Sequence, residues 1–339
     1  MKPIVLIFIF SLALAFPAGL HTQTAGEKDD KPSVFRLDVH VVLVDAQVVN
    51  KKTRHAVNAL KSDNFKIYED NVPQEISSFS QDTLPLSIVL LFDLTDSVRP
   101  VLKSLGEGAL EALQHLKPED EVAVMVYAAS TQVLQDSTTD RSLAVAAIEK
   151  ASHMESDQAA FFNEGIFQAS SYLAKGKNPA SRRVIIWLTD NVPNIPSDAI
   201  PQRYRRSMPE EKLHTQQDAM KELYRTGTVV CSLVKRSELS DQGESALMSK
   251  PVERMLHPPG EVYKYAAATG GQVVEFNKKQ LKAKLAELVD DLRMRYSLGY
   301  HPSVQKPKGK FCTIKVKLSP ELKKTEGNLI VEAREGYYR

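Results

Sequence analysis

The chain has little cysteine and no excess of charge of one sign. Only Cys231 and Cys312 occur in 339 residues, which excludes a disulfide-stapled scaffold, and their spacing is not that of zinc ligands. We expect both to be small buried hydrophobic residues, although the sequence leaves open whether they pair. Lys plus Arg total 44 and Asp plus Glu total 42, a formal net charge of +2. This near balance argues against nucleic acid or an acidic lipid surface as a partner.

The signature motifs of several enzyme classes are also missing. The chain has no H-E-x-x-H zinc motif, no Walker or G-x-G-x-x-G loop after a predicted strand, and no G-x-S-x-G nucleophile elbow. Ser232 and Lys235 have Ser-x-x-Lys spacing, but on a predicted strand residues three apart point to opposite faces. We therefore predict that the protein is not an enzyme.

Beyond the N-terminus no apolar run is long enough to span a bilayer. Lys2 precedes the apolar run 4–16, which only Ser11 interrupts, and Pro17-Ala18-Gly19 follows. Such a run is short for a membrane span of about 20 residues and is typical of a secretory signal peptide. We assign residues 1–26 to the signal peptide and the start of a linker, and we expect a secreted or periplasmic protein. An uncleaved anchor helix is the alternative.

With 42% hydrophobic and 25% charged residues, the chain has the composition of a globular protein. Its length predicts two domains, or a large α/β domain with a smaller companion. Residues 34–84 have strand periodicity. In 34–49 every second residue from 35 to 43 is apolar: Phe35, Leu37, Val39, Val41 and Leu43. The segments 65–68 and 75–79 flank a turn at Glu69-Asp70-Asn71, which predicts a hairpin.

Residues 85–295 alternate short apolar runs with helix-period segments, as buried parallel strands and crossover helices do. The runs are 86–92, 122–127, 184–188, 229–234 and 273–276. Helices are expected from near Pro100, from about Phe162 and from about Lys278. Strand periodicity returns in 296–339, where 311–318 alternates and 329–333 is its expected partner. The fold class predicted is α/β, a doubly wound domain with a β-sandwich-like unit formed by the N- and C-terminal strands.

Polar residues follow two of the predicted strands. Asp93-Leu94-Thr95-Asp96-Ser97 ends the first run, and Leu188-Thr189-Asp190-Asn191 ends another. Ligands of open α/β sheets bind at the carboxyl ends of the strands. Carboxylate and hydroxyl oxygens suit a hard cation, so we predict that Asp93, Thr95, Ser97 and Asp190 bind Mg²⁺ or Mn²⁺. The alternative is that Asp96 and Ser97 only cap the helix that begins near Pro100.

These residues resemble those of the von Willebrand factor type A (VWA) domain over about 85–295. The resemblance implies a Rossmann-like fold and a metal-ion-dependent adhesion site, which uses Asp-x-Ser-x-Ser, a loop Thr and a later Asp. Asp93, Thr95, Ser97 and Asp190 match that pattern, with Thr95 in place of the first Ser. The loop Thr aligns with Ala160, which has no ligand oxygen in its side chain; Ser156, Asp157 and Asn163 are the candidate substitutes. The resemblance therefore leaves two alternatives, a working adhesion site and a degenerate one.

The flanks resemble the VWFA-related Acidobacterial domain family. The sequence segments that carry this resemblance are Val44-Asp45, 60–70, Arg295-Tyr296-Ser297-Leu298-Gly299-Tyr300-His301-Pro302 and 332–338. With the export predicted from the N-terminal residues, the leading hypothesis is an exported binding protein whose VWA domain engages a protein or cell-envelope component. The long segments 191–206 and 235–260, which follow predicted strands, are candidate contact loops. A metal-free structural or scaffold protein of the envelope is the alternative, and the oligomeric state stays open.

The signal-peptide assignment predicts that the mature protein begins between Ala18 and Glu27. Intact-mass measurement of exported protein checks this, because cleavage removes the apolar run. Exported material that still contains Met1 would contradict the assignment and favour the anchor helix.

Overall fold

The computed structural model describes residues 41–339 except 82, 96–97, 107–108, 129, 155–160, 192–213, 236–260, 278 and 305. The predicted signal peptide, the strand segment 34–40, Ser97, Ala160 and nearly all of both candidate contact loops therefore lie outside the described residues. No described helix is both apolar enough and long enough for a membrane span.

Six strands of the described chain form a central sheet in the order β10-β9-β8-β5-β6-β7. They are β5 (Leu86–Asp93), β6 (Glu121–Tyr127), β7 (Thr131–Thr138), β8 (Arg182–Thr189), β9 (Val229–Lys235) and β10 (Val273–Phe276). Neighbours are parallel except β7, which runs antiparallel to β6. The sequence did not predict β7, whose residues are half-buried or exposed.

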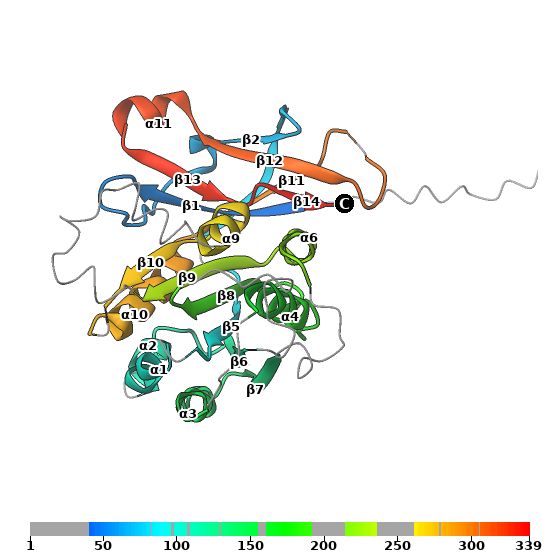
Figure 1. Cartoon of the computed structure of the whole chain (residues 1–339). Helices are drawn as coiled ribbons and strands as arrows, with labels where there is room; N and C mark the ends of the chain where they lie inside the picture. The colour runs from blue at the N-terminus through cyan, green and yellow to red at the C-terminus, as the bar shows by residue number, and fades with distance from the viewer. Residues whose placement is uncertain are drawn as a thin grey trace, which may run out of the picture. The chain divides into compact units, whose positions relative to one another are not determined.

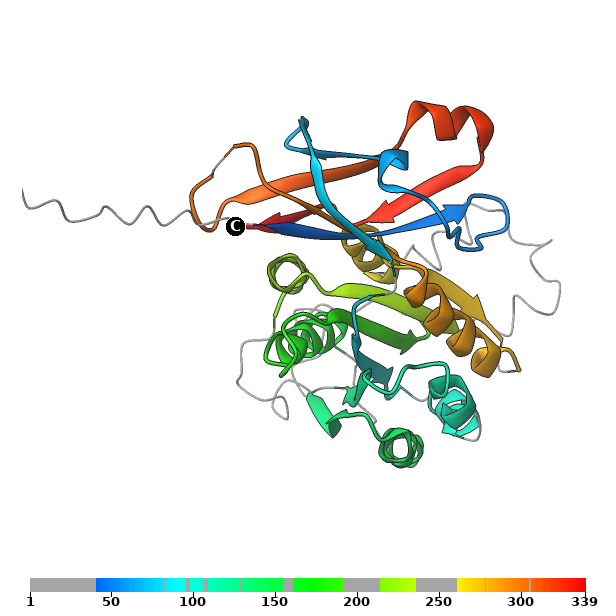
Figure 2. The ribbon, with the colours of Figure 1, turned by 180° about the vertical axis from the view of Figure 1, so that it is seen from behind.

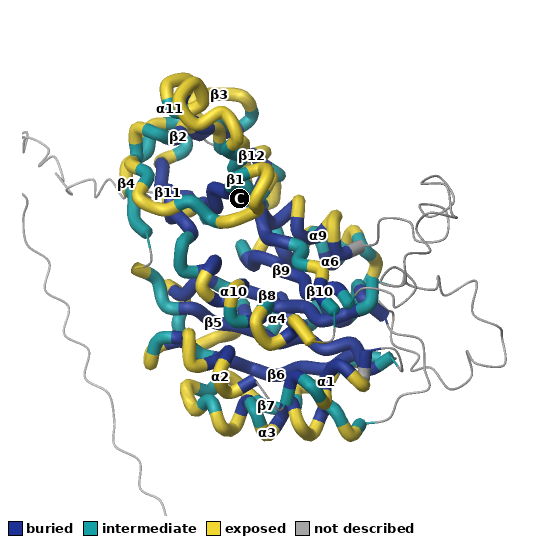
Figure 3. Tube along the Cα trace, turned by 90° about the vertical axis from the view of Figure 1, so that its left-hand side faces the viewer, coloured by how far each residue is buried: buried dark blue, intermediate teal, exposed yellow. Residues whose placement is uncertain are grey.

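Helices cover both faces of the central sheet (Figures 1 and 2). On one face pack α1 (Arg99–Gly106), α2 (Ala109–Leu113), α3 (Arg141–Ser152) and α10 (Leu281–Arg293). On the other pack α4 (Phe162–Ala174), α6 (Gln216–Thr226) and α9 (Glu261–Thr269). Because every residue of β5 is buried, this strand contributes to both cores (Figure 3). The predicted doubly wound α/β fold is confirmed.

The remaining strands form two antiparallel sheets, β13-β1-β11-β4 and β14-β12-β2-β3. They are β1 (Val42–Asn50), β2 (Phe65–Glu69), β3 (Val72–Gln74), β4 (Ile76–Gln81), β11 (Tyr296–Tyr300), β12 (Phe311–Leu318), β13 (Leu329–Ala333) and β14 (Gly336–Tyr338). The short helices η1 (Ser62–Asn64) and α11 (Pro320–Thr325) lie between strands. One apolar cluster joins both sheets, so the N- and C-terminal strands share a core, as predicted. We call this part the sandwich. The domain limits drawn from the sequence remain a proposal.

Three details of the sandwich differ from the sequence prediction. Val42 and Val44 of β1 face the core, whereas Val41 and Leu43, which were predicted to face it, are about half exposed. Odd- and even-numbered positions are both apolar in this segment, so the alternation does not decide which face is buried. β2 forms its hairpin with β3, while β4 pairs with β11 in the other sheet. β13 pairs with β1 and not with β12, so the two C-terminal strands belong to different sheets. Cys231 and Cys312 are buried and free, and they belong to different cores.

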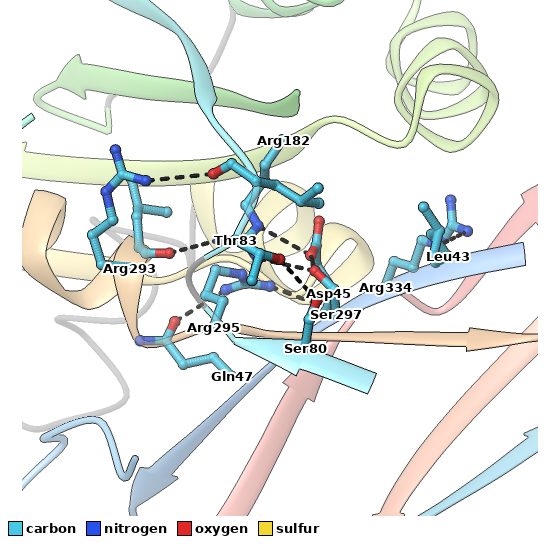
Figure 4. Close-up of polar contacts among 12 residues, drawn as sticks. Leu43, Asp45, Gln47, Ser80, Thr83, Arg182, Arg293, Arg295, Ser297 and Arg334 are labelled. Atoms are coloured by element: carbon cyan, nitrogen blue, oxygen red, sulfur yellow. Dashed lines mark hydrogen bonds and ion pairs between the residues drawn. The ribbon is translucent and has the colours of Figure 1, made fainter. Parts of the chain in front are cut away.

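A buried ionic network joins the sandwich to the central sheet (Figure 4). Arg182, the first residue of β8, donates from Nε to Asp45 Oδ1 at 3.0 Å, and from its other nitrogens to Leu292 O at 2.8 Å and Ser297 Oγ at 3.1 Å. Arg295 donates to Gln47 Oε1 at 3.0 Å. Burial alone would raise the pKa of Asp45, but the charges of Arg182 and Arg295 hold it below its ordinary value.

This network generates a stability prediction. Arg182→Met should lower the free energy of unfolding by up to about 3 kcal/mol, because it leaves the half-buried Asp45 carboxylate without its closest cation. Urea unfolding of the two proteins measures the difference.

Arg183→Met is the matched control, since the neighbouring Arg183 donates to backbone carbonyls, at 2.9 Å to Thr226 O. It should cost only about 1 kcal/mol. Adding Asp45→Asn to Arg182→Met should recover part of the loss. Equal effects of the two arginine substitutions would contradict this account of the network.

Candidate metal centre

Asp93 is the last residue of β5 and is fully buried at the carboxyl edge of the central sheet. Its neighbours β6 and β8 run parallel to it and end at the same edge, with Tyr127 and Thr189 as their last residues. Asp190 follows β8 directly and is half-buried. The fold thus brings the two predicted carboxylates, Asp93 and Asp190, to adjacent strand ends.

Both oxygens of Asp93 accept hydrogen bonds. The backbone N–H of Thr95 donates to Oδ1 at 2.8 Å, while the hydroxyls of Tyr127 and Thr189 donate to Oδ2 at 3.0 and 3.1 Å. Trp187 Nε1 in turn donates to the Tyr127 hydroxyl at 2.8 Å, which orients that hydroxyl toward the carboxylate. The carboxylate is therefore held by donors from the ends of β6 and β8 and from the segment that follows β5.

Packing fixes the Tyr127 ring in this position. Phe162 and Trp187 meet it edge-on, with centroids 5.9 and 6.4 Å away. Gly165 of α4 lies so close that a Cβ there would come within 2.9 Å of the ring, so glycine permits the helix to approach. Burial, and then the negative charge of Asp93, raise the pKa of Tyr127, which therefore stays a hydrogen-bond donor.

Burial raises the pKa of Asp93 to about 6, and the charge of Asp190 acts in the same direction. Hydrogen bonds from Thr95 and Tyr127 oppose this shift without cancelling it. An ionised Asp93 is thus costly at neutral pH, and a bound cation would remove that cost. Asp93, Thr95 and Asp190 offer carboxylate and hydroxyl oxygens, which are the ligand atoms that a hard divalent ion prefers. The fourth predicted ligand, Ser97, lies outside the described residues.

Sequence reasoning missed Tyr127, Thr189 and Trp187 as parts of this centre. Thr189 was visible as a polar residue between a buried strand and Asp190, but Tyr127 reads as one more apolar residue of β6. Asn163, a candidate substitute for the missing loop Thr, accepts a hydrogen bond from Tyr265 of α9 at 2.7 Å. Asn191 adopts a left-handed φ of 59° and donates from its N–H to Thr189 Oγ1 at 3.1 Å, which fixes the turn after Asp190.

Residues 88–192 match the family model of the von Willebrand factor type A domain. The chain contains a VWA domain. The match begins within β5 and includes Asp93, Tyr127, Thr189 and Asp190, so the candidate centre lies inside it. No curated protein sequence matches the chain.

Solved structures with a VWA domain resemble the chain at low identity. Protein BatB from Bacteroides thetaiotaomicron has 15% identity and a TM-score of 0.40, over 61% of this chain and 98% of that one. A von Willebrand factor type A protein from Catenulispora acidiphila has 9% identity and a TM-score of 0.43, over 83% and 75%. Proximal thread matrix protein 1 from the mussel byssus, in a form with a zinc-occupied MIDAS motif, has 12% identity and a TM-score of 0.41, over 61% and 48%.

The raised pKa of Asp93 generates a prediction for the metal-free VWA protein. Between about pH 4 and 6 the folded protein keeps a proton on Asp93 that the unfolded chain has released, so stability should fall as pH rises through this window. The loss is about 2–3 kcal/mol. Asp93→Asn should remove this part of the pH dependence, as measured by urea unfolding at several pH values in the presence of a chelator.

Asp291→Asn is the matched control, because burial also raises the pKa of Asp291 to about 6 at the other edge of the domain. This variant should keep the Asp93 contribution. A pH dependence that Asp93→Asn leaves unchanged would refute the assignment of the shift to Asp93.

Proposed function

We propose that this protein is an exported binding protein of the VWFA-related Acidobacterial group. It engages a protein or cell-envelope component through the carboxyl edge of its central sheet, by way of Mg²⁺ or Mn²⁺. Asp93, Thr95, Ser97 and Asp190 are the proposed ligands, and the N-terminal apolar run of the sequence supports export. The observation that carries the proposal is a buried carboxylate, Asp93, held at that edge by three donors beside a second carboxylate.

Each residue has a separate part in this proposal. Asp93 supplies buried negative charge, and Tyr127 and Thr189 position its carboxylate through Oδ2. Asp190, half-buried at the end of β8, supplies the second charge at the edge of the sheet. A hard cation coordinated by few protein oxygens keeps open positions, which a carboxylate of the partner can fill.

The segments 192–213 and 236–260 support the placement of the partner at this edge. In the sequence they follow β8 and β9, whose carboxyl ends lie next to each other at the edge that carries Asp93. Segments of this length between elements of a compact domain often carry binding residues.

A metal-free scaffold is the second candidate, and one observation favours it. The oxygens of Asp93 already have hydrogen-bond donors from the protein itself, which can hold the strand ends together without an ion. In that case the adhesion-type site is degenerate, in keeping with Ala160 in place of the loop Thr.

Thermal unfolding with added cation separates the two candidates. Mg²⁺ or Mn²⁺ at about 100 times its dissociation constant should stabilise the wild type by about 2.7 kcal/mol, whereas Asp93→Asn should show no response. Asp291→Asn, which removes a similarly shifted carboxylate elsewhere, should respond like the wild type.

An equal response of Asp93→Asn and wild type, or no response of the wild type, would remove the metal-dependent function and leave the scaffold. Capture of partners from envelope extracts, with and without chelator, then tests whether binding itself depends on the ion.

A further inference from the structure

A cavity of about 550 Å³ lies between the sandwich and the VWA domain. Its walls come from the last turn of α9 with Gly270 and Gly271, from the start of β10, from β13 and from the turn after β1. These segments lie at the amino edge of the central sheet, because Gly271 lies two residues before Val273, the first residue of β10. The cavity is therefore at the opposite edge from Asp93 and is independent of the proposed metal centre.

Close backbone contacts shape this cavity. Gly270 has a φ of +72°, and a Cβ at this position would lie 2.5 Å from the backbone of Ala333. Only glycine lets the end of α9 approach β13 in this way. The Glu335 N–H donates to Ala268 O at 2.9 Å, which ties the two walls together. The walls are thus part of the packed structure and form without a ligand.

The charges that line the cavity are mainly negative. Glu332 and Glu335 carry two carboxylates, and the carboxyl end of α9 adds the partial negative charge of a helix C-terminus. Arg54 is the basic residue of the lining, and its guanidinium pairs with Glu332 Oε1 at 2.5 Å. Glu332 Oε2 is buried and accepts no hydrogen bond from the described chain.

Arg54 occupies the position that an external cation would take. It sits in a tight turn with a φ of 60°, closed by its own N–H donating to Asn50 O at 2.8 Å. Its side chain is 50% exposed, whereas that of Glu332 is only 18% exposed. Releasing Arg54 to water costs little, because ion pairs with one solvated partner are weak. Glu332 then needs another cation.

We propose that this cavity binds a primary ammonium group on an aliphatic stem, which displaces Arg54 from Glu332. The carboxylates and the end of α9 attract the ammonium, and a charge-assisted hydrogen bond to Glu332 fixes it. Val273, Val331 and Ala266 provide an apolar wall for the methylene stem. A free diamine and a lysine side chain of a polypeptide share this chemistry.

Calorimetric titration of the folded protein at low salt tests the proposal with cadaverine as the probe and 1,5-pentanediol as its neutral analogue. Cadaverine should bind and pentanediol should not. Glu332→Gln should weaken cadaverine binding about tenfold or more, since the amide oxygen can still accept a hydrogen bond but lacks the negative charge that strengthens it. Arg54→Ala should tighten it about two- to fivefold, because the resident competitor is gone.

Glu111→Gln, which removes an exposed carboxylate that pairs with Lys282 on the far side of the domain, controls for net charge and should change nothing. An acetylated and amidated tripeptide with a central lysine distinguishes the sources: tighter binding than cadaverine favours a polypeptide, and weaker binding favours a free amine. Equal binding of pentanediol would overturn the proposal. So would an unchanged affinity in Arg54→Ala, a variant in an exposed turn that does not depend on the folding of Glu332→Gln.

Discussion

The half-buried carboxylate of Asp45, paired with the buried Arg182, is the constraint on which the arrangement of the whole described chain depends. It extends from β1 at the N-terminal side of the sequence and is met by Arg182 at the start of β8 and by Ser297 of β11. Removing one partner from an ion pair that is largely buried is strongly destabilising, so these three strands are stable together where the charges of Arg182 and Asp45 meet. The sandwich, built from both ends of the chain, is thereby fixed to the amino edge of the VWA sheet.

This placement leaves the carboxyl edge of the sheet to binding. Arg182 and Thr189 are the two ends of β8, one in the ionic network and the other on Asp93. A strand of this length spans roughly 23 Å at about 3.3 Å per residue, so a partner at Asp93 need not touch the sandwich. The cavity at Arg54 and Glu332 lies on the sandwich side, and the two proposed sites can be tested independently.

Local patterns predicted the elements well where a single face decides burial, and less well where partners are distant in sequence. The leucine stripe Leu281, Leu285, Leu288 and Leu292 lies on α10 as expected, and Asp93 and Asp190 follow buried strands as expected. β7 was missed because an edge strand needs few apolar residues, and β13 was given the wrong partner because pairing with β1 has no local signal. Tyr127 was missed since a buried hydroxyl donor looks apolar in a strand pattern.

The chemistry of Asp93 favours a charge-dependent role over a purely structural one. A scaffold needs only that the strand ends be joined, and an amide or hydroxyl at this position could make hydrogen bonds without the cost of burying a charge. The donors from Thr95 and Tyr127 lower the pKa of Asp93, yet burial and Asp190 still bring it to about 6. Burial and the charge of Asp190 therefore both disfavour the ionised form of Asp93. A divalent cation would interact with both carboxylates at once, which hydroxyl donors on one carboxylate cannot do, and for this reason we propose the metal-dependent function ahead of the scaffold.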